Sequence, residues 1–218
     1  MKVCLYLIFT DAERYYKTMY YNEEKSWNLR ETHMFDTLLR LLKYRGEGSK
    51  AIVWAHNCHV GNARAMSMGP RSRLNLGQLA RERFGKDVIS LGCGTYTGTV
   101  AAAHEWGSNM QIMEISPALE DSYEFLAHKT GLDSFCIDLR EGKCDEELRK
   151  ELLKKRLQRF IGVIYYPETE RESHYSAVEL PRQFDGYIWF DTTRAVKPLG
   201  IRRSDTALEF NENYPFEV

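Results

Sequence analysis

Two histidines, an amide and a thiol stand together in the segment Trp54-Ala-His-Asn-Cys-His-Val-Gly61. Because histidine titrates near neutral pH, His56 or His59 could take a proton from water as it attacks an ester or another carbonyl, and Asn57 could bind the substrate. Two alternatives stay open. One is a structural histidine pair, and the other is metal ligation by His56, Cys58 and His59, for which no further ligand and no diagnostic spacing is visible. We favour catalysis or substrate binding.

A second cluster places Arg30, His33 and Met34 three or four residues apart, on one stripe of a predicted helix. The guanidinium of Arg30 stays charged and donates paired hydrogen bonds, so it could hold a developing oxyanion or a substrate carboxylate. The spacing by itself is somewhat more typical of side chains that pack over a helix at an interface. We carry Arg30 as a catalytic candidate, and His33 and Met34 as substrate-binding candidates.

A third polar group lies in Pro167–Tyr175, directly after an apolar run. On its own this segment would be a solvated loop. Four of its side chains could also line a cleft: Glu168, Glu170, Arg171 and His174. Of these, we carry Glu168, Arg171 and His174 as candidate substrate-binding residues.

The glycines of Gly92-Cys-Gly-Thr-Tyr-Thr-Gly98 resemble a dinucleotide-binding loop at first sight. The third glycine comes one residue too late for G-x-G-x-x-G, and no P-loop lysine follows. The sequence therefore predicts a tight turn or a substrate-lining loop here, and no nucleotide cofactor.

Hydrophobic periodicity predicts that helices and strands alternate along the chain. Helices are expected at 27–42, 74–84, 117–128 and 145–160. Strands are expected at 51–55, 87–91, 134–139, 160–166 and 186–190. This alternation is typical of an α/β fold, in which helices cover a parallel or mixed sheet. The strand at 51–55 would place the two histidines at its carboxyl end, where ligands bind in open α/β sheets.

Composition limits the classes of partner. The chain has 218 residues, and its 30 basic and 31 acidic side chains give a net charge of −1. No excess charge favours binding to nucleic acid or to an anionic membrane. The 5 scattered cysteines favour a reducing compartment, the cytoplasm, and no apolar run is long enough to span a membrane. The apolar residues 3–9 lack the cleavage site of a signal peptide, so we expect a buried strand or an ill-defined chain start there.

Several ordered blocks resemble the erythromycin esterase family, including its succinoglycan-biosynthesis-like members, from about Ala12 to Leu199. The matching blocks are Glu13-Arg-Tyr-Tyr16, Trp27-Asn28-x-Arg30-x-x-His33-Met34, Ala55-His56-Asn57-x-His59-Val60, Pro167-Glu168-Thr169-Glu170-Arg171-x-Ser173-His174-Tyr175, Leu180-Pro181-x-Gln183-Phe184-Asp185 and Phe190-Asp191-x-Thr193-Arg194-Ala195-Val196. One position departs from the pattern, because Glu31 stands where an aspartate is expected.

The resemblance implies hydrolysis of a small-molecule ester, the macrolide lactone in the best-known members, and hence a response to antibiotic. A histidine-activated water would attack without an obligatory metal or other cofactor, and the His-Asn-x-His block would line the site. Full-length members carry an N-terminal half with a Gly-Glu-x-x-His-Gly block, which Gly46-Glu47-Gly48 does not match. The chain thus resembles the C-terminal half alone, with its ester-cleaving ability latent or absent in isolation, and an N-terminal half of the same family is a candidate partner.

We therefore expect a divergent segment at 1–11, an erythromycin-esterase-like portion at 12–200 and a tail at 201–218. A sheet that lacks its first strands would expose an unpaired edge and an apolar flank. Two other functions stay open: a non-catalytic module that binds a small molecule, and a metal-dependent hydrolase that uses the histidines and Cys58. The natural substrate stays unassigned, since a family fixes a reaction class far better than a ligand.

Overall fold

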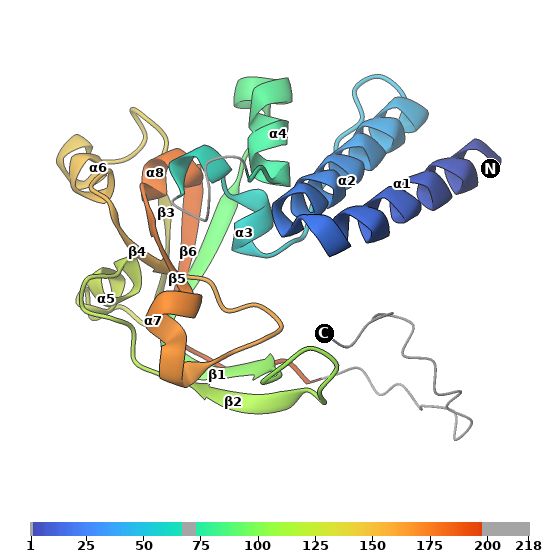
Figure 1. Ribbon diagram of the computed structural model, residues 1–218. Helices are drawn as coiled ribbons and strands as arrows, with labels where there is room; N and C mark the ends of the chain where they lie inside the picture. The colour runs from blue at the N-terminus through green and yellow to red at the C-terminus, as the bar shows by residue number, and fades with distance from the viewer. Residues whose placement is uncertain (1, 67–72, 198–218) are drawn as a thin grey trace.

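In the computed structural model a helical hairpin, α1 (Lys2–Tyr21) and α2 (Glu23–Arg45), projects away from the sheet (Figure 1). Asn22 separates the two helices, and its side chain caps α2 by accepting a backbone hydrogen bond. The predicted helix at 27–42 is confirmed and is longer at both ends. The apolar residues 3–9 lie inside α1, so the expected buried strand is wrong. No helix within the described ranges is long and apolar enough to cross a membrane.

The structure describes residues 2–66 and 73–197, so the tail at 201–218 lies outside the described residues. After the hairpin, the chain alternates short helices with strands. The helices are α3 (Asn57–Val60), α4 (Leu76–Phe84), α5 (Tyr123–His128), α6 (Glu146–Leu152), α7 (Glu170–Ser173) and α8 (Leu180–Gln183), with 3-10 turns at Ala63–Ala65, Gly85–Asp87 and Pro167–Thr169. The strands are β1 (Leu91–Ala102), β2 (Gln111–Ile115), β3 (Ser134–Asp138), β4 (Arg156–Arg159), β5 (Tyr175–Val178) and β6 (Gly186–Thr193).

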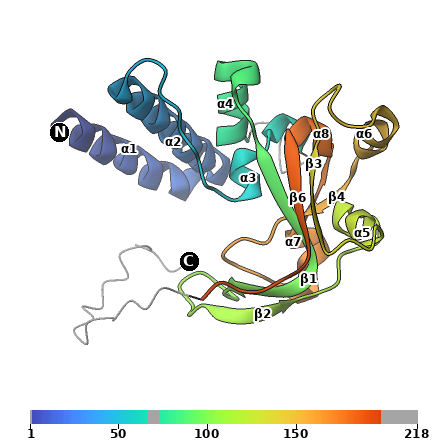
Figure 2. The same cartoon turned by 180° about the vertical axis from the view of Figure 1, so that it is seen from behind.

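The main sheet is mixed and has the strand order β2-β1-β6-β3 (Figure 2). β1 and β6 run parallel, with Leu91 opposite Gly186 at one end and Gly98 opposite Thr193 at the other. β2 and β3 join the two edges as antiparallel strands. A second, two-stranded sheet pairs β4 with β5. The predicted fold class, an α/β fold with a mixed sheet flanked by helices, is confirmed.

The glycine-rich segment Gly92–Gly98 lies in strand β1, so the expected loop or tight turn is wrong. The glycines serve close packing instead. A Cβ on Gly94 would collide with the hydroxyl of Tyr187, and a Cβ on Gly98 would collide with the backbone of Thr193. Gly98 has a φ of +126°, a conformation that favours glycine. It sits where β1 stops pairing with β6 and is already paired with β2.

Two predicted strands are shifted or unpaired. Residues 51–55 run extended but pair with no strand among the described residues, so the predicted buried strand is wrong here. The strand predicted at 87–91 begins only at Leu91: Asp87 ends a 3-10 turn, and residues 88–90 are in neither a helix nor a strand. The strands predicted at 134–139 and 186–190 are confirmed as β3 and β6.

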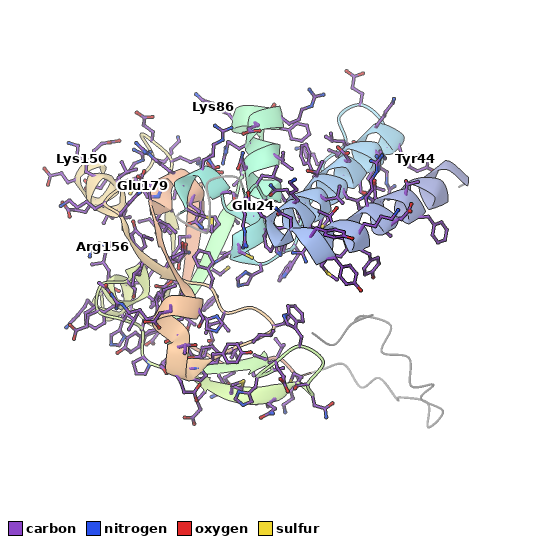
Figure 3. The ribbon with its side chains drawn as sticks, viewed as in Figure 1. Glu24, Tyr44, Lys86, Lys150, Arg156 and Glu179 are labelled. Carbon is purple, nitrogen blue, oxygen red and sulfur yellow. The ribbon has the colours of Figure 1, made fainter. Side chains whose placement is uncertain are left out.

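Three other elements predicted from leucine or apolar patterns are shorter in the structure than expected. The helix predicted at 145–160 is capped by Asp145 and ends at Leu152, after which β4 pairs with β5. Residues 160–166 form only an isolated bridge, and the helix predicted at 117–128 is confined to α5. Lys150 is exposed and points outward from α6 (Figure 3).

The core lies where the main sheet meets α5, α8 and the second sheet. Its buried side chains are Tyr123, Leu139, Leu152, Phe160, Val178, Leu180, Phe184, Tyr187 and Trp189. At one end of this core a buried ion pair joins Arg159 of β4 to Glu170 of α7 at 3.0 Å. The Arg159 guanidinium also donates to three backbone carbonyls, those of Thr95, Tyr96 and Ser116.

We expect Arg159→Met to lower the free energy of unfolding by about 3–5 kcal/mol, because removing one partner leaves a buried charge uncompensated. Urea denaturation followed by circular dichroism measures this. Arg171→Met is the matched control, since Arg171 pairs with Asp121 on the surface, and it should leave the unfolding midpoint unchanged. Equal midpoints for both variants would contradict the structural role of Arg159.

Candidate functional site

A buried carboxylate, Glu31 of α2, organises the site. Its side chain has no exposed surface, and it accepts a hydrogen bond from the Leu76 N–H in the first turn of α4 at 3.1 Å. Its other oxygen lies 2.7 Å from Nδ1 of His59. The His59 ring stacks on Trp27, with centroids 5.2 Å apart, and the Arg30 guanidinium lies 4.8 Å from the centroid of the Trp27 ring. Two of the three predicted catalytic residues, Arg30 and His59, therefore both contact Trp27.

Two asparagines fix α3, the short helix that carries His59. Asn75, the buried N-cap of α4, donates to the carbonyls of Cys58 and Gly61 at 2.8 and 2.6 Å. Asn57 uses both ends of its amide on Cys93 of β1: Nδ2 donates to the carbonyl at 2.6 Å, and Oδ1 accepts from the N–H at 3.1 Å. The predicted substrate-binding amide of Asn57 is thus engaged by the strand.

The third predicted catalytic residue, His56, faces the thiol of Cys58. Its Nδ1 lies 3.0 Å from Sγ, and the same nitrogen accepts from the Cys58 backbone N–H at 3.3 Å. The edge of the His56 ring lies against Phe160, whose N–H donates to the carbonyl of His174. Sequence reasoning considered Cys58 only as a metal ligand, and the structure makes it a partner of both histidines.

The electrostatics of this group favour a charged pair. Burial disfavours the Cys58 thiolate, but hydrogen bonds with His56 and His59 outweigh burial and lower the pKa of Cys58 to about 7. A hydrogen bond with Cys58, followed by one with Glu31, raises the pKa of His59 to about 9. Between these two values the thiolate and the imidazolium coexist.

Arg30 also borders a small pocket between α1 and α2. The pocket has a volume of about 210 Å³, and it is lined by Asp11, Ala12, Tyr15, Tyr16, Leu29, Arg30 and His33. His33 is held there by Asp11, whose carboxylate lies 2.7 Å from Nδ1. Nε of Arg30 is buried without a hydrogen-bond partner, so it could donate to an acceptor on a ligand. Met34, half-buried on α2, is not part of this lining.

The remaining predicted substrate-binding residues lie around α7. Glu168 is exposed, and Arg171 pairs with Asp121 at 2.6 Å on the surface. His174 is buried, and its Nε2 accepts from the Tyr166 N–H at 3.0 Å. Burial lowers the pKa of His174. Within the described part of the chain, none of these side chains contacts His56 or His59.

Three site residues were missed from the sequence: Trp27, Glu31 and Asn75. Trp27 and Glu31 stand four positions apart on one helix, which placed them on the same face as each other. Glu31 was noted only as a departure from a motif. Asn75 was readable as a helix cap, but its bonds to α3 depend on the fold.

The geometry also bears on the metal alternative. Among residues 2–66 and 73–197, no group of three or more His, Cys, Asp or Glu side chains is arranged to hold a metal ion. His56, Cys58 and His59 are engaged with one another and with Glu31 instead.

We expect His59 to titrate with an apparent pKa of about 9, and Glu31→Gln to lower it, because the neutral amide no longer favours the imidazolium. Heteronuclear NMR of the imidazole rings measures this. His174 is an internal reference, since it does not contact Glu31 and its titration should be the same in both proteins. A wild-type His59 that titrates at the usual 6.5 would contradict the charged pair.

Three kinds of comparison place the chain among known proteins. The family model described as erythromycin esterase matches residues 6–193. Erythromycin esterase type II of Escherichia coli is 26% identical over 162 residues, which are 72% of this chain and 35% of that relative. The chain therefore spans about a third of the length of this curated relative.

The solved structures share the fold. A protein from Bacillus cereus has a TM-score of 0.65 at 19% identity, covering 78% of this chain and 39% of that one. A succinoglycan biosynthesis protein has a TM-score of 0.61 at 21% identity, covering 79% and 40%. A mutant of the erythromycin esterase EreC in its open conformation has a TM-score of 0.52 at 18% identity, covering 81% and 40%. The mixed sheet with its flanking helices is thus less than half of each of these chains. Since the family model extends over most of its residues, the chain belongs to the erythromycin esterase family.

Proposed function

We propose that the chain is the histidine-bearing part of a hydrolase that cleaves a small-molecule ester. The single observation that carries this proposal is the contact of His59 with the buried Glu31, in a chain of the erythromycin esterase family. A histidine oriented by a carboxylate is the arrangement that acyl-transfer enzymes use to move protons. Arg30, which lies over the Trp27 ring, is the candidate for stabilising the oxyanion.

The raised pKa of His59 defines its role. Below pH 9 the imidazole is mostly protonated, so it is suited to protonate the leaving alkoxide and to stabilise negative charge. Activation of the attacking water then falls to His56, or to the Gly-Glu-x-x-His-Gly block that the family resemblance assigns to the other half. We therefore expect the isolated chain to turn over esters poorly.

The size of the pocket limits the substrate that this chain holds alone. Its volume of about 210 Å³ is below the roughly 300–1,000 Å³ of sites for drug-sized ligands. A macrolide lactone, and with it a response to antibiotic, is the substrate class that the family favours, and it requires a larger site. A small ester or the acyl end of a larger one fits the pocket beside Arg30. Four described cysteines are free thiols: Cys58, Cys93, Cys136 and Cys144. Free thiols are typical of reducing compartments, which supports the proposed cytoplasmic location.

Residues 51–54 are the surface that we assign to the other half. This apolar stretch ends two positions before His56, and in Figure 2 it runs as an open trace from α2 to α3. Ile52 is 95% exposed and Trp54 is 97% exposed. An exposed extended apolar segment is a template for strand addition. The matched relatives are about twice as long as this chain, so we propose that the remaining part of a family member covers it.

We expect the chain to hydrolyse p-nitrophenyl acetate or erythromycin faster when it is mixed with the part of the E. coli relative that lies outside the match. His59→Asn should reduce that rate by about 10²–10⁴, the usual contribution of a general acid or base. His128→Asn is the matched control, because His128 also contacts a carboxylate, Asp191, at 2.7 Å and stacks on Tyr96. A mixture that binds erythromycin in calorimetry without hydrolysing either ester would favour a binding module and overturn the proposal.

The double variant Ile52→Ser, Trp54→Ser tests the docking surface. We expect it to unfold at the same urea concentration as the wild type, since both side chains are exposed, but to lose association with the other half in analytical ultracentrifugation. Trp106→Ser is the control, because Trp106 is 63% exposed in the turn between β1 and β2. Undiminished association of the double variant would place the interface elsewhere.

A further inference from the structure

Hydrolysis by an activated water, as proposed above, does not involve the thiol of Cys58, the cysteine between the two histidines. Cys58 stands at the x position of His-Asn-x-His, in the first turn of α3. Its sulfur is half-buried: one side packs against the core, and the thiol meets Nδ1 of His56 at 3.0 Å. The thiol is therefore presented to a proton acceptor within the candidate site.

The orientation of His56 makes it an acceptor. Its Nδ1 accepts the Cys58 backbone N–H, so this nitrogen is unprotonated, and its one lone pair is shared between that N–H and the thiol at 3.0 Å. A proton can pass from sulfur to His56 without any movement of the backbone. His59 also interacts with the thiol and favours its charged form, and Glu31 holds Nδ1 of His59 at 2.7 Å.

The other described thiols lack these neighbours. Cys144 is half-buried like Cys58, but burial, followed by the charge of Asp145, raises its pKa. Cys93 is exposed as a residue. Partial desolvation of its thiol, followed by the nearby Cys136, raises the pKa of Cys93. Cys58 is the member of this set whose pKa is lowered, and thiolate character governs the reactivity of cysteine.

We propose that Cys58 is a nucleophile that accepts the acyl group of an ester, with His56 as proton acceptor and His59, held by Glu31, as proton donor to the leaving oxygen. The proposal rests on the esterase function proposed above, and it adds a covalent step. A nucleophile within hydrogen-bond reach of a base is the arrangement that activates thiols in other enzymes.

The thiol proton passes to Nδ1 of His56, and the sulfur electron pair forms a bond to the carbonyl carbon. The bond from that carbon to the leaving oxygen breaks, and its electron pair stays on the oxygen, which takes the proton of His59. The products are a thioester on Cys58 and the alcohol. Water, deprotonated by a base of the other half, then attacks the thioester, and that proton is returned to His59. The sulfur recovers its proton from His56, so the carboxylic acid is released and the site is restored.

The two half-reactions need different groups. Acylation uses only Cys58, His56 and His59, which this chain supplies. Hydrolysis of the thioester needs an activated water, and its activation falls in part to the Gly-Glu-x-x-His-Gly block of the other half. The chain alone should therefore stop at the acyl-enzyme, and its reaction with an activated ester should be a single burst.

The test mixes the full chain, alone, with p-nitrophenyl acetate. We expect one equivalent of p-nitrophenolate in a burst, and peptide mass spectrometry should find one acetyl group on Cys58. Cys58→Ser should lose the burst, Cys144→Ser should keep it, and His56→Gln should slow it by about 10²–10⁴. A burst that survives in Cys58→Ser, or an acetyl group on another residue, would overturn the proposal.

A second measurement needs no variant. Iodoacetamide alkylates thiolates, so at pH 7 we expect Cys58 to be labelled at least about tenfold faster than Cys144 in the same molecule. The labelling rate of Cys58 should increase with pH, with the midpoint of the increase at about pH 7, the pKa of the thiol. The titratable groups that face the thiol are His56 and His59, and Glu31 contacts His59. Equal labelling of Cys58 and Cys144 would contradict the activated thiol.

The outcomes separate this inference from the proposed function. If the mixture with the other half hydrolyses esters equally well with Cys58→Ser, the nucleophile is water alone and the inference fails while the esterase stands. If Cys58 is acetylated but the mixture never turns over, the thiol is reactive and the proposed esterase function fails.

Discussion

The charge on Glu31 is the constraint on which this half of the molecule depends. A carboxylate without exposed surface costs several kcal/mol unless hydrogen bonds and charge replace its water. Here the replacements come from two other elements, the first turn of α4 and the imidazole of His59. Three helices must therefore meet at one point, and the same pairing that satisfies the buried anion sets the orientation of the histidine ring. The hydrogen bond between Glu31 and His59 is therefore needed both for the stability of the buried carboxylate and for the position of the histidine.

The sequence predicted the parts of the site that depend on residue type and local order. The two histidines, Arg30 and the helix that carries Arg30 could all be found from spacing, and the family blocks identified the chain. Glu31 could not be found in this way, because nothing local distinguishes a buried glutamate from the many solvated ones on helices. Its role depends on α4, which begins far away in the sequence.

The errors in the predicted fold also have physical causes. The glycines of β1 suggested a loop, but a strand tolerates glycine where a neighbouring backbone or a tyrosine approaches closely, as at Gly94 and Gly98. The leucine pattern after Asp145 fitted a helix and a strand alike, and pairing with β5 decided in favour of the strand. Residues 51–55 have the composition of a buried strand, yet burial requires a neighbour that the described chain does not provide.

The two hydrogen bonds between Asn57 and Cys93 limit where another strand could pair with this sheet. Along the edge of β1 that faces α3, the N–H and the carbonyl of Cys93 are both consumed by one side-chain amide. An incoming strand would have to displace that amide, and with it the short helix that carries both histidines. The short helix of the candidate site thus occupies this edge of β1, whereas residues 51–54, the docking surface proposed above, lie outside the hydrogen bonds that hold this helix.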